Sequence, residues 1–317
     1  MKVTDHIKSA KSTLLSFEIL PPLKGKSIQG IYDSIDPLLE FSPAFINVTY
    51  HREEYKYKKM PGDLLQKVTI RRRPGTVGIC AAIVNKYKID AVPHLICGGF
   101  AKEETESALI DLQFLGIDNV LALRGDPIPS EKHFIPDPGG HAYATDLVKQ
   151  IGELNRGIYL HEEIQNESNT NFCIGVAGYP EKHFEAINKK TDLKYLKQKV
   201  DAGAEYIITQ IFYDNQKYFD FVKDCRAAGI DVPIIPGIKP ITKISHIKFI
   251  PKTFHIDFPD EFGMDLIDCK TDEEVSEVGT TWAIQQAKEL IDFGAPVIHF
   301  YTMGRSQAVR KVAENVF

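Results

Sequence analysis

The sequence predicts an α/β fold, a single (β/α)8 barrel, on three observations: a repeated helix–glycine–strand pattern, eight apolar strands, and polar residues where those strands end. The pattern occurs four times, as LGIDNVLAL, AGAEYIITQ, AGIDVPIIP and FGAPVIHFY. Glycine directly after a helix is the usual left-handed cap, and strands buried on both faces of a parallel sheet are apolar throughout. The pattern therefore predicts a repeating unit of helix, short loop and parallel strand.

Eight segments have the composition of such a strand. In chain order they span residues 14–20, 44–50, 91–97, 119–125, 173–179, 205–212, 233–238 and 297–303. A doubly wound sheet is the alternative architecture, but no G-x-G-x-x-G sequence follows any of these strands, so the usual dinucleotide fingerprint is missing. We therefore expect one barrel over residues 1–317, with its site at the carboxyl ends of the strands.

Composition restricts the class of protein. The chain has 317 residues, 43% of them hydrophobic, which is enough for a sizeable core, and its net charge of −5 argues against a nucleic-acid-binding surface. No apolar run is long enough to span a membrane, and the N-terminus does not resemble a signal peptide. The five cysteines are scattered and contain no C-x-x-C pair, so we expect buried thiols, no metal site and a cytoplasmic protein.

Polar residues occur at the ends of seven of the eight strands. The first strand contains Glu18 inside an otherwise apolar run, where a carboxylate is costly to bury unless it is paired or protonated. The later strands end on, or run into, Thr49, His94, Arg124, Asp126, Tyr179, Gln210, Tyr301 and Arg305. Because the carboxyl ends of barrel strands meet at one mouth, this ring of polar side chains predicts a ligand site.

The motifs SFEILPP, FINVTYH, PHLIC, NVLALRGDP, HAYATDLV, VAGYPEKHFEA, DLKYLKQKVDAGAEYIITQIFYD, PIIPGIKP and HFYTMGR follow one another along the chain. In order and spacing they resemble the methylenetetrahydrofolate reductase family of one-carbon metabolism, in its bacterial form with the catalytic barrel alone. The resemblance implies a cytoplasmic flavoprotein in which NADH or NADPH reduces FAD, and FAD then reduces 5,10-methylenetetrahydrofolate to 5-methyltetrahydrofolate. It also implies that residues 1–317 are one catalytic domain without a C-terminal regulatory domain.

Three residues would be catalytic by this resemblance. Glu18 would be the general acid that protonates N10 of the folate and opens its ring, since apolar neighbours raise the pKa of a carboxyl group. Asp126 would stabilise the cationic iminium and contact the flavin. Gln210 would bind the pterin, although an amide that satisfies a backbone group at the barrel end is an open alternative.

The remaining site residues also follow from the resemblance. FAD would be bound by Thr49, His94, Leu123, Arg124, Gly125, Asp126, Tyr143, Ala144, Tyr179, His183, Asp192 and Lys199. The folate would be bound by Gln210, Tyr301 and Arg305, with Arg305 near its glutamate tail. NADH is preferred to NADPH by resemblance to bacterial forms, a protein electron donor remains open, and a homo-oligomer is left open.

Two segments are longer than is usual in the family. Residues 52–85 follow the second strand and should lie over the mouth of the barrel, whereas the insertion RGIYLHEEIQNESNT precedes the fifth strand and should lie at the opposite end. Between the seventh and eighth strands the resemblance implies an aromatic that stacks on a ligand, from the region 240–255. Phe249 sits near that position with Ile250 beside it, Trp282 lies in the last helix of the segment, and the sequence does not choose among them. Two alternative functions are another flavin barrel, of the proline dehydrogenase type, and a flavin-binding subunit without catalysis.

Overall fold

The computed structural model describes residues 1–128, 131–161, 163 and 168–317. It confirms the (β/α)8, or TIM, barrel, with all main-sheet strands parallel in the order β10-β11-β1-β2-β5-β6-β7-β8-β9. These strands are β1 Leu14–Ile19, β2 Phe45–Val48, β5 Asp90–Ile96, β6 Asn119–Leu123, β7 Cys173–Gly178, β8 Tyr206–Thr209, β9 Ile234–Ile235, β10 Gly237–Ile238 and β11 Val297–Tyr301. Strands β9 and β10 both lie within the predicted strand 233–238, and they pair with β8 and β11 at the two ends of the sheet order. This predicted strand therefore closes the barrel.

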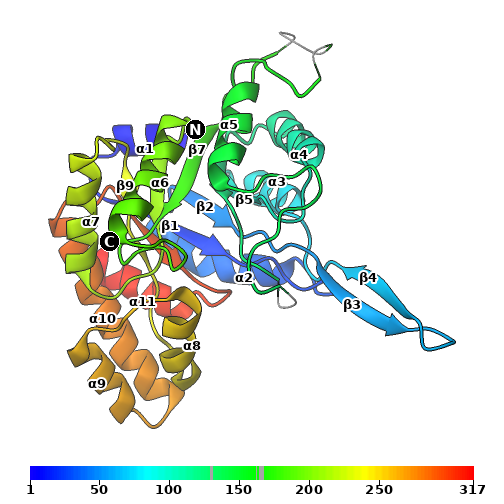
Figure 1. Ribbon diagram of the computed structural model, residues 1–317. Helices are drawn as coiled ribbons and strands as arrows, with labels where there is room; N and C mark the ends of the chain where they lie inside the picture. Colours follow the sequence, from blue (N-terminus) through cyan, green and yellow to red (C-terminus); the bar gives the residue numbers. More distant parts are fainter. Residues whose placement is uncertain (129–130, 162, 164–167) are drawn as a thin grey trace.

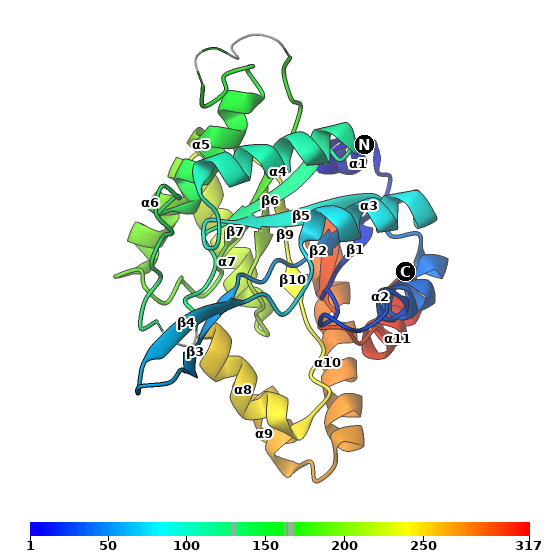
Figure 2. The same cartoon turned by 90° about the vertical axis from the view of Figure 1, so that its right-hand side faces the viewer.

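The helices surround the strands, as Figures 1 and 2 show. They are α1 Val3–Ser9, α2 Gln29–Ile35 with the 3-10 helix Asp36–Phe41, α3 Thr76–Tyr87, α4 Lys102–Phe114, α5 Ala144–Leu154, α6 Lys189–Asp201, α7 Asn215–Ala227, α8 Ile244–Phe254, α9 Asp260–Asp268, α10 Asp272–Asp292 and α11 Gln307–Val316. The four repeat glycines follow α4, α6, α7 and α10 with φ of +69°, +122°, +73° and +93°, the left-handed region that the pattern predicted.

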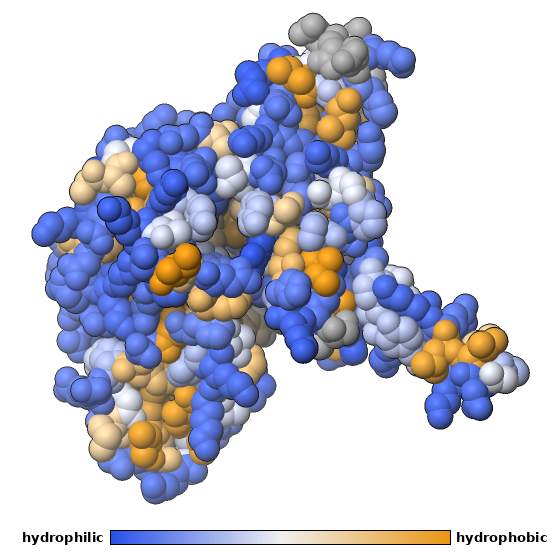
Figure 3. All heavy atoms as spheres, in the orientation of Figure 1, coloured by the Kyte–Doolittle hydropathy of each residue, from blue (hydrophilic) through white to orange (hydrophobic). Residues whose placement is uncertain are grey.

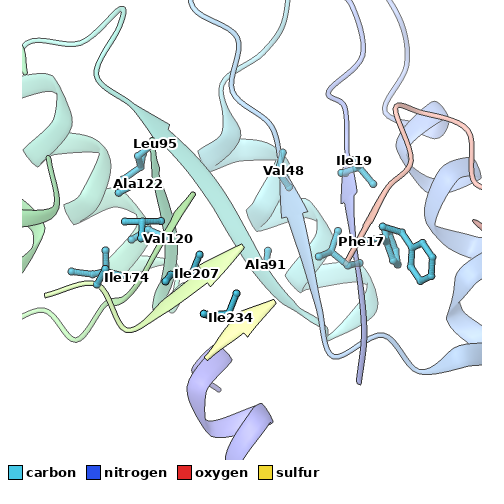
Figure 4. Packing of buried hydrophobic residues seen from close by; sticks show 14 of the residues in the cluster. Phe17, Ile19, Val48, Ala91, Leu95, Val120, Ala122, Ile174, Ile207 and Ile234 are labelled. Carbon is cyan, nitrogen blue, oxygen red and sulfur yellow. The ribbon is translucent and has the colours of Figure 1, made fainter. Parts of the chain in front are cut away.

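The core has two layers. Outward-facing strand residues such as Phe17, Val48 and Ile174 pack against the helices (Figure 4). Inside the barrel, Tyr206 and its neighbours fill the amino-terminal end, where Val3 of α1 packs against them. The Val3 N–H donates to Asn119 Oδ1 at 2.8 Å, so α1 is attached across this end and the mouth lies at the other end.

The long segment after β2 forms an antiparallel hairpin, β3 Glu54–Lys59 and β4 Leu65–Ile70, followed by α3. Its base lies at the mouth, as expected, and its outer part projects away from the barrel (Figures 1 and 2). The described part of the second insertion follows α5 on the side where α1 lies, which fits the opposite end; residues 162 and 164–167 lie outside the described residues.

Four cysteines are buried and Cys269 is half-buried, as free thiols. Among the residues that the structure describes, no helix is both long and apolar enough to cross a bilayer.

Candidate active site

A cavity of about 1490 Å³ opens at the carboxyl ends of the strands. It exceeds the range of about 300–1,000 Å³ that is usual for small-ligand pockets, so it has room for a dinucleotide and a second ligand. Its walls include these predicted residues: Glu18, Thr49, His94, Leu123, Arg124, Gly125, Asp126, Tyr143, Ala144, Tyr179, His183, Asp192, Lys199, Gln210 and Tyr301. Arg305 is the exception, because it is exposed and does not line the cavity.

Glu18 lies near the carboxyl end of β1 and lines the cavity. Strand β1 pairs with β2 and β11, in a register that places Glu18 beside Asn47 and Tyr301. The Glu18 side chain is 15% exposed, and burial raises its pKa to about 8. Glu18 therefore carries a proton at neutral pH.

His94 is a titratable neighbour of Glu18. Its Nε2 lies 3.5 Å from Glu18 Oε2, and burial, followed by the nearby His51 charge, lowers the pKa of His94 to about 3. At neutral pH both groups are uncharged, so this contact is between a carboxylic acid and a neutral imidazole rather than an ion pair. His94 therefore does not lower the pKa of Glu18, as a positively charged partner would.

Further polar groups lie beneath Glu18 in the barrel interior. Asn47 Nδ2 is 3.3 Å from His94 Nε2, and Ser16 Oγ is 2.8 Å from His299 Nδ1. Burial lowers the pKa of His299 to about 3. Asn47, Ser16 and His299 were missed by the sequence analysis, although period-2 alternation places Ser16 on the same face of β1 as Glu18.

Gln210 follows β8 and reaches the cavity. Its Oε1 accepts a hydrogen bond from the Ile211 N–H at 2.8 Å. The amide oxygen of Gln210 thus satisfies a backbone group, as the alternative role proposed. The Gln210 NH2 group has no acceptor among the described residues, and it can donate to a ligand.

Arg124, Gly125 and Asp126 follow β6 along the wall. Gly125 has φ of +85° and packs against Ile96, which brings the backbone close to the cavity. Arg124 Nη1 donates to Glu185 Oε2 at 2.5 Å, and the Asp126 carboxylate is exposed at the mouth. The turn therefore presents one cation and one anion to the same cavity.

A second group of side chains lies at the far end of the cavity, between β7 and α6. Lys199 Nζ donates to the Ala177 carbonyl at 2.6 Å; burial lowers the pKa of Lys199 to about 8, which the charge of Asp192 partly offsets. Asp192 Oδ2 accepts from the His183 N–H at 2.9 Å, so one of its oxygens already fixes the loop after β7. The His183 and Tyr179 rings meet edge to face at 4.7 Å.

The apolar residues considered between β10 and β11 do not line the cavity. Trp282 stacks on Phe262 at 4.6 Å and donates to the Tyr213 carbonyl, which makes it a core residue. Phe249 is 49% exposed and Ile250 is buried, and neither lines the cavity. The cavity instead contacts Phe254 at the end of α8, which the sequence analysis missed.

Arg305 belongs to a cationic cluster beyond Tyr301. Lys239 is only 4% exposed, and burial, followed by the nearby Arg305 charge, lowers its pKa to about 8. Burial and the nearby Lys239 charge lower the pKa of His246 to about 4. Tyr301 itself donates to the Thr209 carbonyl at 2.7 Å.

Comparison with known proteins identifies the family. The family model described as methylenetetrahydrofolate reductase matches residues 2–316. The chain belongs to the methylenetetrahydrofolate reductase family. Methylenetetrahydrofolate reductase 2 of Saccharomyces cerevisiae is 34% identical over 100% of the chain and 50% of its own length. The 5,10-methylenetetrahydrofolate reductase of Escherichia coli is 32% identical over 92% of the chain and 87% of its own length.

The chain spans about half the length of several of these curated relatives. The names of relatives specify NADH in Arabidopsis thaliana and NADPH in Caenorhabditis elegans. A solved structure of an uncharacterized Clostridium thermocellum protein that binds two copies of 5-methyl-5,6,7,8-tetrahydrofolic acid superposes with a TM-score of 0.58. It covers 99% of this chain and 98% of its own at 15% identity, a likeness of fold.

Proposed function

We propose that this family member reduces 5,10-methylenetetrahydrofolate to 5-methyltetrahydrofolate with FAD as cofactor and NADH or NADPH as electron donor. The observation that carries the proposal is Glu18, a buried carboxyl group on the wall of a large cavity that keeps its proton at neutral pH. Opening the folate ring requires a proton on its N10 leaving nitrogen, and a carboxyl group of this pKa can supply one near neutral pH. Family membership supports the same reaction.

The residues around Glu18 suit the charge that ring opening creates. The product of ring opening is a cationic iminium, and the exposed carboxylate of Asp126 is a fixed negative charge at the same mouth. The Gln210 NH2 group is available to a polar edge of the pterin. Glu18 would thus be the acid, Asp126 the electrostatic stabiliser and Gln210 the positioning contact.

The far part of the cavity fits FAD. Arg124 and Lys199 provide positive charge for a pyrophosphate, and the first turn of α5, from Ala144, lies on the wall, where backbone N–H groups favour anions. The loop that Asp192 fixes adds His183 and Tyr179 to the same wall. When bound, FAD would supply hydride chemistry that side chains cannot.

The cationic cluster beyond Tyr301 would bind the glutamate tail of the folate. Arg305 is exposed, its charge helps to lower the pKa of Lys239, and the charge of Lys239 helps to lower the pKa of His246. A carboxylate there would be bound by at least one fixed cation. This extends the predicted role of Arg305, although Arg305 does not line the cavity.

We further propose that residues 1–317 act as one catalytic domain. The test is turnover: the purified chain with FAD, NADH or NADPH and 5,10-methylenetetrahydrofolate should form 5-methyltetrahydrofolate, measured by mass spectrometry. Proline with a quinone acceptor tests the proline dehydrogenase alternative and should give no turnover. Product from proline but not from the folate would contradict the proposal.

A further inference from the structure

The hairpin and its flanks, residues 52–73 and hereafter the arm, have a surface that the rest of the chain does not cover. Strands β3 and β4 form a two-stranded sheet of their own, which projects from the barrel (Figures 1 and 2). An isolated two-stranded hairpin is marginally stable in water. The end of the arm also exposes large apolar side chains: Tyr57 at 65%, Met60 at 40%, Leu64 at 66% and Leu65 at 62%. Figure 3 shows a hydrophobic patch, in orange, at the end of the arm.

The arm is also oppositely charged to the rest of the molecule. It contains eight lysines and arginines against three acidic residues, a net charge of +5, whereas the remaining chain has 30 cationic and 40 acidic residues, a net charge of −10. At the base, Arg71 and Arg72 pair with acidic residues of the arm itself. Farther out, Lys56, Lys58 and Lys59 are exposed and form no ion pair with any described residue.

A complementary surface lies on α9 and the start of α10. Residues 257–277, hereafter the acidic face, contain nine aspartates and glutamates and one lysine, a net charge of −8. On α9, Met264 is 61% and Ile267 is 62% exposed, and the exposed carboxylates of Asp265 and Asp268 each adjoin one of them in sequence. The acidic face therefore offers carboxylates and apolar side chains together, as the arm offers lysines and apolar side chains.

Within one chain the two surfaces do not meet. Figure 1 shows the arm and α9 leaving the barrel in different directions. We propose that the arm of one copy binds the acidic face of a second copy, and that the second copy's arm binds the first in return. Reciprocal contacts close a two-fold dimer, whereas a one-way contact would build an open chain of subunits.

The physical basis is charge attraction plus apolar burial. Lys59, which shares a face of the hairpin with Tyr57 and Leu65, would meet Asp265 or Asp268 across the interface, and Lys56 and Lys58 would add positive charge from the other face. The apolar side chains at the end of the arm would at the same time cover those exposed on α9, which removes apolar surface from water. Since the charged groups are exposed at the rim, salt should weaken the dimer by screening.

The test is the mass of the full FAD-loaded chain by sedimentation velocity at about 50 mM and about 500 mM NaCl, where screening differs strongly. A dimer is expected at the lower salt, with at least a ~10-fold higher dissociation constant at the higher salt. Two variants reverse the charges: K56E/K58E/K59E on the arm, and D265K/D268K/E277K on the acidic face. Each should be monomeric alone, because like charges then oppose one another in both contacts.

An equimolar mixture of the two variants gives the decisive result. In the mixed dimer the reversed arm meets the reversed face, and the natural arm meets the natural face, so dimers should return. The control K8E/K11E/K311E makes the same change in net charge as the arm variant, at exposed lysines outside the arm, and should stay dimeric. A monomeric natural protein at low salt, a dimer that ignores the arm variant, or a mixture that stays monomeric would each overturn the proposal.

Discussion

Replacing Glu18 by glutamine keeps the shape of the side chain and removes its acidic proton. Glu18 is 15% exposed and lies 3.5 Å from the neutral ring of His94, so an amide fits the same site without leaving a charge unpaired. We expect Glu18→Gln to fold, to bind FAD and to oxidise the nicotinamide donor at an unchanged rate. We expect its reduction of the folate to fall, because the neighbouring His94 is not protonated to imidazolium and the hydroxyl proton of Tyr301 is already donated to the Thr209 carbonyl.

The size of the loss follows from the pKa. A carboxyl group with the ordinary value of 4.5 is about 0.3% protonated at pH 7, whereas Glu18, with a pKa of about 8, is about 90% protonated. Burial thus makes the acid form about 300-fold more abundant, and a positioned general acid contributes about 10²–10⁴-fold to a rate. Folate reduction by Glu18→Gln should therefore drop by about 10²–10⁴-fold, and in the natural protein it should decline above about pH 8.

The assay separates the two half-reactions anaerobically. Stopped-flow absorbance follows bleaching of the flavin by NADH or NADPH, and then recovery of its colour after 5,10-methylenetetrahydrofolate is added. Glu18→Asp is the matched control, since it retains an acid at a shifted position and should keep part of the activity. Folate reduction by Glu18→Gln at the natural rate would refute the role of Glu18 as the acid.

Three further predictions follow from the same contacts. Burial raises the folded pKa of Glu18 above its unfolded value, so the natural protein loses stability as pH rises from about 4.5 to 8. Glu18→Gln should therefore gain about 4 kcal/mol over the natural protein from pH 5 to pH 9 in urea unfolding, and an equal gap at both pH values would contradict this. Asp192→Ala removes the acceptor of the His183 N–H and should weaken FAD binding about 10-fold in fluorescence titration, whereas Asp192→Asn, which keeps an oxygen, should lose less. Arg305→Ala should raise the KM for the folate about 10-fold and leave donor oxidation unchanged, with the exposed Arg310→Ala as control; equal effects on both would argue against a tail site.

Most of the barrel could be predicted because each strand carries its own local signal. All four helix–glycine–strand repeats are present, each glycine has the positive φ that a left-handed cap requires, and all eight predicted strands are present. The hairpin was missed as structure, although Pro61, Gly62 and Asp63 are typical turn residues between two β-prone runs. Its many charges resembled a solvated loop, and an exposed ribbon lacks the apolar face by which strands are recognised.

The positions of the site residues could be predicted where strand ends fix them. Glu18 and Gln210 reach one cavity because barrel geometry brings the strand ends together. The sequence could not show which aromatic residue between β10 and β11 contacts the cavity, because most of this segment lacks the helix–glycine–strand repeat that fixes positions elsewhere. There tertiary packing places Phe254 at the cavity and packs the half-buried Trp282 against Phe262 of the core.

The most direct test of the whole account is one anaerobic reaction. The FAD-loaded protein is photoreduced until the flavin is colourless, 5,10-methylenetetrahydrofolate is added, and the visible spectrum is followed. We expect rapid return of the oxidised flavin bands together with one equivalent of 5-methyltetrahydrofolate. A protein that binds FAD but stays bleached in the presence of the folate would contradict it.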